Sequence, residues 1–104
     1  MQYIQSLGRA AYGHVADVSQ LAEVENLVAA SVSNLGPLTV MTANAGIAQV
    51  KPLLELSEED VRHIFDVNVF GVFNCYSAGA RQLIKQGNGG KLIGCARYFS
   101  FTHV

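Results

Sequence analysis

Two long stretches of the chain carry apolar residues at helical spacing. In the first, residues 20–35, apolar side chains recur every three or four positions on one helix face: Leu21, Val24, Leu27, Val28, Val32 and Leu35. Ser19 is a candidate N-cap, and Gly36-Pro37 follows in the order that ends a helix. This pattern predicts an amphipathic helix between Ser19 and Gly36.

The second helical stretch, residues 58–86, is longer and apolar on two faces. Residues 57–60 (Ser-Glu-Glu-Asp) predict its start, because the serine side chain can cap the first backbone N–H groups of a helix. The acidic residues favour the positive end of the helix dipole, and Asp60 takes the reciprocal position of a capping box. One face carries Val61, Ile64, Phe65, Asn68, Val72, Tyr76, Leu83 and Ile84, and the second carries Val69, Phe70 and Phe73. Such a helix is expected to pack on its own sheet and on a partner chain. Gly71 and Gly79 each cost about 1 kcal/mol relative to alanine, which indicates close packing there.

Three short segments around these helices have strand character. Ala10 to Val18 is a weak candidate, since alanine and glycine are poor strand formers. Leu38 to Thr42 and Lys91 to Ala96 predict short buried strands. Residues 2–8 predict the end of a helix that stops at Gly8. The order strand, helix, strand, long helix, strand is typical of βαβ units in an α/β fold with a parallel sheet.

Composition narrows the functional classes. The 104 residues fit one domain, and with 50% hydrophobic and 14% charged residues the chain can build a core. A net charge of −1 without a basic cluster argues against nucleic acid as a partner. The three histidines match no metal spacing, so no metal site is expected. The N-terminal residues lack a signal-peptide core and the uncharged stretch 67–80 is too short to span a bilayer, so we expect a cytoplasmic protein.

The two cysteines, Cys75 and Cys95, have no close spacing and no accompanying histidine pattern. We expect free, buried thiols in a reducing compartment. One cysteine would lie in the middle of the long helix and the other late in a strand, so a disulfide between them is not expected.

The segment Thr42 to Ile47 (Thr-Ala-Asn-Ala-Gly-Ile) is the first candidate for chemistry. Ala45 and Gly46 keep side-chain bulk away from the end of the strand, and Asn44 offers both a donor and an acceptor. Ligands of open parallel sheets bind beyond the carboxyl ends of the strands. Asn-Ala-Gly is also ordinary turn chemistry, so these residues alone leave both interpretations open.

Four features together carry a family resemblance: Asp17-Val18, Asn44-Ala45-Gly46, Asn68 in the long helix, and Gly90-Lys91-Leu92-Ile93. In this order and spacing the chain, from about Leu7 to Ala96, resembles the short-chain dehydrogenases/reductases, oxidoreductases that use NAD or NADP. Residues 47–84 look closest to acetoin (diacetyl) reductase-like members. The resemblance implies a partial Rossmann-like, doubly wound parallel sheet of about three strands and two main helices, and an alcohol/ketone pair as substrate.

The resemblance also implies roles for single residues. Asp17 would accept a hydrogen bond from the adenine amino group, and the Val18 backbone would help to hold the ring. Asn44, Ala45 and Gly46 would line the ribose on the nicotinamide side. Asn68 matches the family's catalytic asparagine, whose backbone carbonyl holds a water of the proton relay. Without the family, Asp17 could be a helix-capping acid and Asn68 a buried polar residue that braces a helix kink.

Departures from the family pattern change the expected activity. The family's glycine-rich turn belongs before the region that this chain matches, Arg97 stands at the position of the catalytic serine, and no Tyr-x-x-x-Lys follows before Val104. We therefore expect residues 1–104 to form a single partial dinucleotide-binding domain with a non-family tail at 97–104, weak or no binding of NAD(P), and no reductase activity. The alternatives are a non-catalytic fragment that associates through helix 58–86 with full-length subunits or as a homo-oligomer, and an α/β domain for another ligand.

The family's strand order, 3-2-1-4-5, gives a test of the fold. Residues 38–42 and 91–96 would be the fourth and fifth strands and should pair in parallel. The segment Ala10 to Val18 would be the third strand, whose family neighbours this chain does not contain. It should be displaced or pair directly with residues 38–42.

Overall fold

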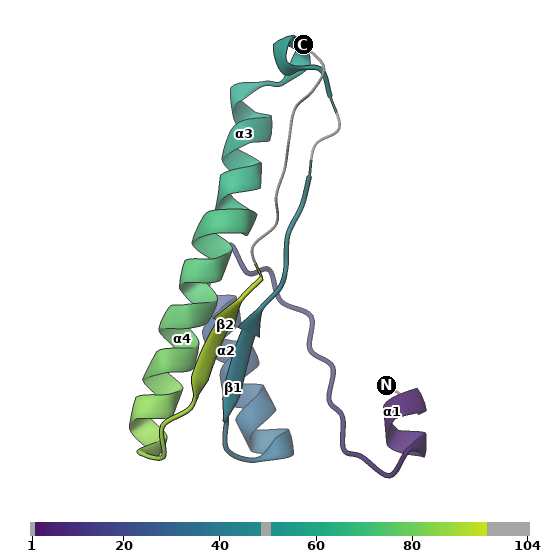
Figure 1. Cartoon of the computed structure of the whole chain (residues 1–104), viewed down its shortest axis with the longest axis vertical. Coiled ribbons are helices and arrows are strands. Elements are labelled where there is room, and N and C mark those ends of the chain that lie inside the picture. Colours follow the sequence, from purple (N-terminus) through teal and green to yellow (C-terminus); the bar gives the residue numbers. More distant parts are fainter. Residues whose placement is uncertain (1, 49–50, 96–104) are drawn as a thin grey trace.

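The computed structural model describes residues 2–48 and 51–95. Its elements, in chain order, are α1 (Gln2–Ser6), α2 (Leu21–Leu35), β1 (Val40–Ala43), the 3-10 turn η1 (Leu53–Glu55), α3 (Glu58–Phe65), the π-helical turn η2 (Asp66–Phe70), α4 (Gly71–Gln86) and β2 (Lys91–Gly94). The segments α3, η2 and α4 follow one another without a break and form one long rod, and the two strands lie beside its α4 half (Figure 1).

The two strands pair in parallel, as the sequence predicts. Val40 lies opposite Lys91, and Ala43 lies opposite Gly94. Hydrogen bonds of 3.0 Å from the Lys91 N–H to the Thr39 carbonyl and from the Cys95 N–H to the Ala43 carbonyl extend the ladder at both ends. Within the described residues, these two strands are the whole sheet. The fold is therefore part of a Rossmann-like α/β unit, with two strands instead of the expected three.

The predicted strand over Ala10 to Val18 is wrong. Residues 9–17 have no regular secondary structure, and Val18 begins a turn. A strand needs a neighbour that satisfies its backbone groups, and the weak strand propensity of this segment does not compensate for the lack of one. Within the described residues the segment does not pair with residues 38–42, so direct pairing, one of the two expected outcomes, is wrong. Its last residue is attached to α4, because the Asn74 side-chain amide donates to the Val18 carbonyl at 2.9 Å.

The predicted N-cap of the first long helix is also wrong. The capping position of α2 is held by Gln20, whose side chain makes no capping bond. Ser19 instead donates its backbone N–H (3.0 Å) and its hydroxyl (2.7 Å) to Oδ1 of Asp17. A carboxylate two residues upstream offers both donors an acceptor, and this local turn competes with the cap. The helix ends as expected at Gly36, which has a φ of 98°.

The core lies between the two long helices and one face of the sheet. Buried Val24 and Val28 of α2 pack with Ala43 of β1 and with Cys75 and Ala78 of α4. Close approach explains both helical glycines. A Cβ on Gly79 would lie 2.9 Å from Cγ of Met41, and one on Gly71 would lie 2.7 Å from Cγ2 of Val18. The expected close packing at these positions is confirmed.

The opposite face of the sheet is exposed. Val40 retains 45% and Ile93 44% of their accessible surface, so the expectation that both strands are buried is wrong. In the described part of the chain, α2 and α4 cover one face only, which is why β1 alternates between exposed and covered residues.

Both cysteines are free, as expected, but only Cys75 is buried, and burial raises the pKa of its thiol. Cys95 is exposed, contrary to expectation.

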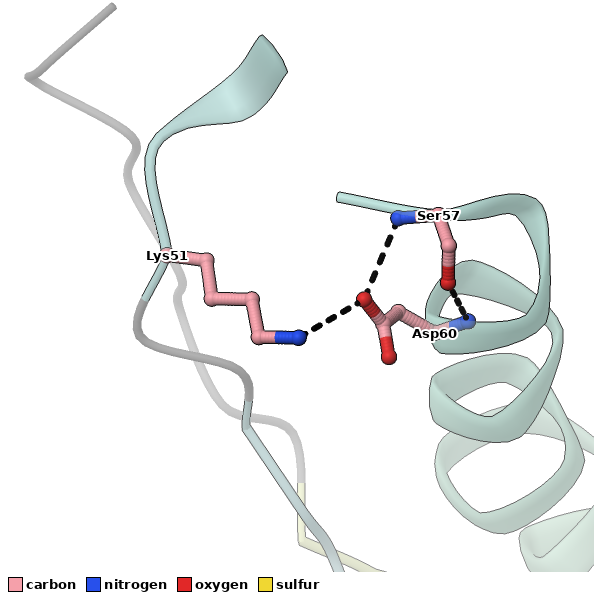
Figure 2. Close-up of polar contacts among 3 residues, drawn as sticks. All are labelled: Lys51, Ser57 and Asp60. Carbon is pink, nitrogen blue, oxygen red and sulfur yellow. Dashed lines mark hydrogen bonds and ion pairs between the residues drawn. The ribbon is translucent and has the colours of Figure 1, made fainter. Parts of the chain in front are cut away.

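The long rod begins where the sequence predicts. Ser57 Oγ accepts from the Asp60 N–H at 3.0 Å, and Asp60 Oδ2 accepts from the Ser57 N–H at 3.1 Å, which completes a capping box (Figure 2). Lys51 Nζ lies 3.1 Å from the same Asp60 oxygen. The Ser57 backbone N–H, and after it Lys51, lower the pKa of Asp60.

The rod is buried along one side, which matches the first predicted apolar face only in part, because Val61 and Phe65 of that face are exposed. The sheet side carries the buried residues Val67, Gly71, Asn74, Cys75, Ala78, Gly79 and Leu83. The second predicted face leaves Phe70 56% and Phe73 66% exposed, and Ile84 of the first predicted face is 80% exposed. At the start of the chain, the short helix α1 ends before Gly8, which has a φ of 80°. Among the described residues, no helix is long and apolar enough to cross a membrane.

Candidate functional site

A cavity of about 440 Å³ lies at the carboxyl ends of the two strands. It is lined by Ala45, Gly46, Asn68, Val72, Tyr76, Gly94 and Cys95. The structure therefore brings together three of the residues singled out in the sequence: Ala45 and Gly46 after β1, and Asn68 from the rod. Asn44 follows β1 directly but is not among the lining residues, and neither are Asp17 and Val18.

The Asn68 side chain fixes the segment that forms the cavity wall. Its Oδ1 accepts from the Ile47 N–H and its Nδ2 donates to the Ile47 carbonyl, both at 2.8 Å. Asn68 stands in the π-helical turn η2, a type of turn that often occurs at functional sites. Its side chain thus braces the loop after β1, whereas the alternative interpretation drawn from the residues alone had it bracing a helix kink. The family role concerns its backbone carbonyl, which this contact does not use.

Asp17 and Val18 form a second, separate region of the candidate site. Asp17 Oδ1 accepts both bonds from Ser19, while Oδ2 has no hydrogen bond within the described part of the chain. The Ser19 hydroxyl, then the Ser19 N–H and to a smaller extent the charge of His63, lower the pKa of this exposed carboxyl. Asp17 is therefore an ionised acceptor at neutral pH. Since Gln20 holds the capping position of α2, Asp17 is not a helix cap.

Sequence reasoning missed two amides and four residues of the cavity wall, Val72, Tyr76, Gly94 and Cys95. Asn74 holds Val18, and Gln86 holds both the N–H (2.8 Å) and the carbonyl (2.7 Å) of Leu38. The signal for Asn74 was its place among small and apolar residues on one helix face, because a buried amide must be hydrogen-bonded. Tyr76 and Cys95 line the cavity, and the sequence carried no local signal for either role.

The described residues that line the cavity carry no formal charge. Besides backbone and apolar side chains they present an amide, a phenol and a thiol, from Asn68, Tyr76 and Cys95. Over residues 2–48 and 51–95, no three His, Cys, Asp or Glu side chains lie together so that they could hold a metal ion. Arg97 and the rest of the expected non-family tail, residues 97–104, lie outside the described residues.

A family model described as short chain dehydrogenase matches residues 1–96. The chain belongs to the short-chain dehydrogenase/reductase family. It is 43% identical over 86 residues to a diacetyl reductase ((S)-acetoin forming) of Staphylococcus epidermidis, which covers 83% of this chain and 34% of that enzyme. The resemblance drawn from the four sequence features is thereby confirmed.

Solved structures of short-chain dehydrogenases/reductases resemble this fold. A short-chain type dehydrogenase/reductase from Mycobacterium marinum superposes with a TM-score of 0.84 at 33% identity, over 89% of this chain and 38% of that one. A gluconate 5-dehydrogenase from Burkholderia cenocepacia, in complex with NADP and tartrate, superposes with a TM-score of 0.77 at 31% identity. The match covers 92% of this chain and 40% of that one. The chain spans roughly a third of the length of the diacetyl reductase that it matches.

Proposed function

We propose that this chain is the central segment of an NAD- or NADP-dependent oxidoreductase that acts on an alcohol/carbonyl pair, and that these 104 residues alone do not catalyse the reaction. The observation that carries the proposal is the cavity at the strand ends, where Ala45, Gly46 and Asn68 meet. Family membership and the diacetyl reductase relative support the reaction class.

In this proposal the exposed Asp17 carboxylate accepts from the adenine amino group through Oδ2. The adjacent Val18 backbone, held in place by Asn74, supports the adenine ring. Asn44, Ala45 and Gly46 line the nicotinamide-side ribose, and the Asn68 backbone carbonyl holds a relay water. The cofactor supplies the hydride when bound, and the protein orients it and moves a proton.

Inactivity of the isolated chain follows from the missing proton donor. A tyrosine hydroxyl has an unperturbed pKa of about 10 and needs a nearby cation to act as an acid near neutral pH. Arg97 occupies the position of the family's serine, and no Tyr-x-x-x-Lys is present in the 104 residues. We expect no oxidation of NADH or NADPH above a protein-free blank with acetoin or diacetyl.

The binding half of the proposal is tested by NMR titration of the ¹⁵N-labelled chain with NADH. We expect shifts at Asp17, Val18, Ala45 and Gly46 and a Kd in the millimolar range or weaker, about 4 kcal/mol or less. Asp17→Asn keeps the Ser19 contact through Oδ1 but places a donor at the proposed adenine position, so binding should weaken.

The matched control is Glu58→Gln, an exposed carboxylate-to-amide change at a residue paired with Arg62. It should leave NADH binding unchanged. Equal affinity of Asp17→Asn and wild type, or low-micromolar binding by the wild type, would contradict the proposed site.

A second candidate function is a non-catalytic subunit that associates with full-length family members or with a second copy through helix 58–86. It is favoured by the exposed aromatic rings of Phe65, Phe70 and Phe73 on the rod, away from the sheet. An apolar surface of this kind is typical of a protein interface.

A further inference from the structure

Tyr76 places its hydroxyl at the end of β2. A Cβ on Gly94 would lie 2.5 Å from the Tyr76 Oη and 3.3 Å from its Cζ, so the ring occupies the space of the side chain that Gly94 lacks. Tyr76 also packs against the core from α4 and lines the cavity. The pair of Gly94 and Tyr76 thus brings a phenol from the helix to the strand edge where the candidate site lies.

This hydroxyl is available to a ligand. The Tyr76 Oη makes no hydrogen bond within the described part of the chain, and no buried side-chain nitrogen or oxygen there lacks a partner. The Oη must therefore reach open space, and the cavity is the open space beside it. The side-chain amide of Asn68, which also lines the cavity, already bonds to the backbone of Ile47 through both its oxygen and its nitrogen. Tyr76 is then a stronger hydrogen-bond donor for a ligand than the Cys95 thiol, which donates weakly.

The lining selects the class of ligand. Among the described residues, no ionised side chain lines the cavity, so this part of the wall offers a phosphate or a carboxylate no counter-charge. Ala45 and Val72 provide apolar walls, and a volume of about 440 Å³ is typical of a small-molecule site. A carbonyl oxygen is an acceptor without formal charge, and the phenol can donate a hydrogen bond to it.

We propose that the Tyr76 hydroxyl orients a small neutral carbonyl compound in this cavity by donating a hydrogen bond to its oxygen. The inference rests on the proposed function, which supplies two sources of such an oxygen: the substrate carbonyl and the carboxamide of the nicotinamide ring. Tyr76 binds and orients in this proposal, and no proton is transferred.

The test titrates the ¹⁵N-labelled full chain with acetoin and, separately, with nicotinamide. At least one probe should shift the amides of Ala45, Gly46, Gly94 and Cys95 with saturation. Tyr76→Phe keeps the ring and removes only the hydroxyl, so the Kd should rise about 3- to 10-fold, the effect of one neutral hydrogen bond. The matched control is Tyr12→Phe at an exposed position outside the cavity, which should leave the Kd unchanged.

Gly94→Ala gives an independent variant, because its Cβ displaces the hydroxyl without removing it. This variant should bind the same probe more weakly, while its amide spectrum still shows a folded chain. A response to acetoin alone would identify the substrate carbonyl as the source, and a response to nicotinamide alone the cofactor carboxamide.

The proposal is overturned if neither probe shifts these amides up to about 100 mM, or if Tyr76→Phe binds as tightly as the wild type. Failure of the proposed cofactor site would appear instead in the NADH titration of Asp17→Asn. That variant should leave acetoin and nicotinamide binding unchanged, because Asp17 does not line the cavity.

Discussion

Asn68 and Ile47 are joined by two hydrogen bonds, each 2.8 Å long, between one side-chain amide and both backbone groups of the loop residue. The same arrangement recurs at the other end of β1, where the Gln86 amide holds the N–H and the carbonyl of Leu38. One continuous helical rod therefore fixes the chain on both sides of a strand that, within the described residues, has a partner strand on only one edge. We infer that these two amides hold the strand, and with it the cavity wall, in place.

The first prediction concerns this contact. Asn68→Ala should destabilise the fold by about 1–3 kcal/mol, because it leaves the partly buried N–H and carbonyl of Ile47 without their partners. Urea unfolding measures the loss, and hydrogen exchange at the Ile47 amide should accelerate more than exchange at β2. Asn34→Ala, which removes an exposed amide bonded only to the Ala30 carbonyl within its own helix, is the control and should have little effect. Unchanged exchange at Ile47 would show that the contact does not hold the loop.

The second prediction concerns pH and the start of α3. The folded-state pKa of Asp60 is lowered, so its contribution to stability is fully present above the unfolded value, which is about 3.9. That contribution is lost as the pH falls through the lower, folded value. The melting temperature of Asp60→Asn should therefore lie below that of wild type at pH 7, and the difference should shrink as the solution is acidified below about pH 4.

Asp66→Asn, a carboxylate-to-amide change at an exposed position further along the rod, is the control for the second prediction. Its melting temperature at pH 7 should lie close to that of the wild type, because the Asp66 side chain makes no capping bond within the described residues. A difference between wild type and Asp60→Asn that stays constant from pH 7 to well below 4 would rule out the capping carboxylate as its cause.

Local patterns in the sequence were sufficient for the features that depend on local physics. The capping box at Ser57 and Asp60, the end of α2 at Gly36, and the close packing at Gly71 and Gly79 all follow from residue types within one or two turns. The pairing of β1 with β2 also came out correctly, but it rested on the family's strand order rather than on local pattern.

Features that depend on distant neighbours could not be predicted in this way. In the part of the chain that the structure describes, the segment ending at Val18 has no strand partner and Ile93 has no covering layer. The local sequence pattern indicates neither fact. Helical periodicity placed Tyr76 on an apolar face, yet only the fold reveals Gly94 opposite its hydroxyl. The π-helical turn adds a residue to one turn of the rod, and so shifts the helix faces on its two sides relative to a uniform 3.6-residue period.

Two surfaces of the chain could mediate association. The Thr39 and Ala43 carbonyls accept hydrogen bonds from β2. Backbone groups alternate along a strand, so Val40 and Thr42 direct theirs to the opposite edge, which has no partner strand within the described residues. The second surface is the apolar outer side of the rod, which includes Phe73.

The third prediction assigns self-association of the isolated chain to the open edge of β1, because unpaired strand groups beside exposed apolar surface form a template for another strand. Sedimentation velocity should show association that grows with concentration. Thr42→Pro removes an N–H that β2 does not use and should suppress this association, since proline is tolerated on an edge strand and blocks further pairing. Phe73→Ser, which makes the outer side of the rod more polar, should leave it largely unchanged. The opposite result, loss of association with Phe73→Ser and not with Thr42→Pro, would reject the edge and favour the rod as the contact surface. A monodisperse monomer with a sharp, reversible thermal transition would reject both.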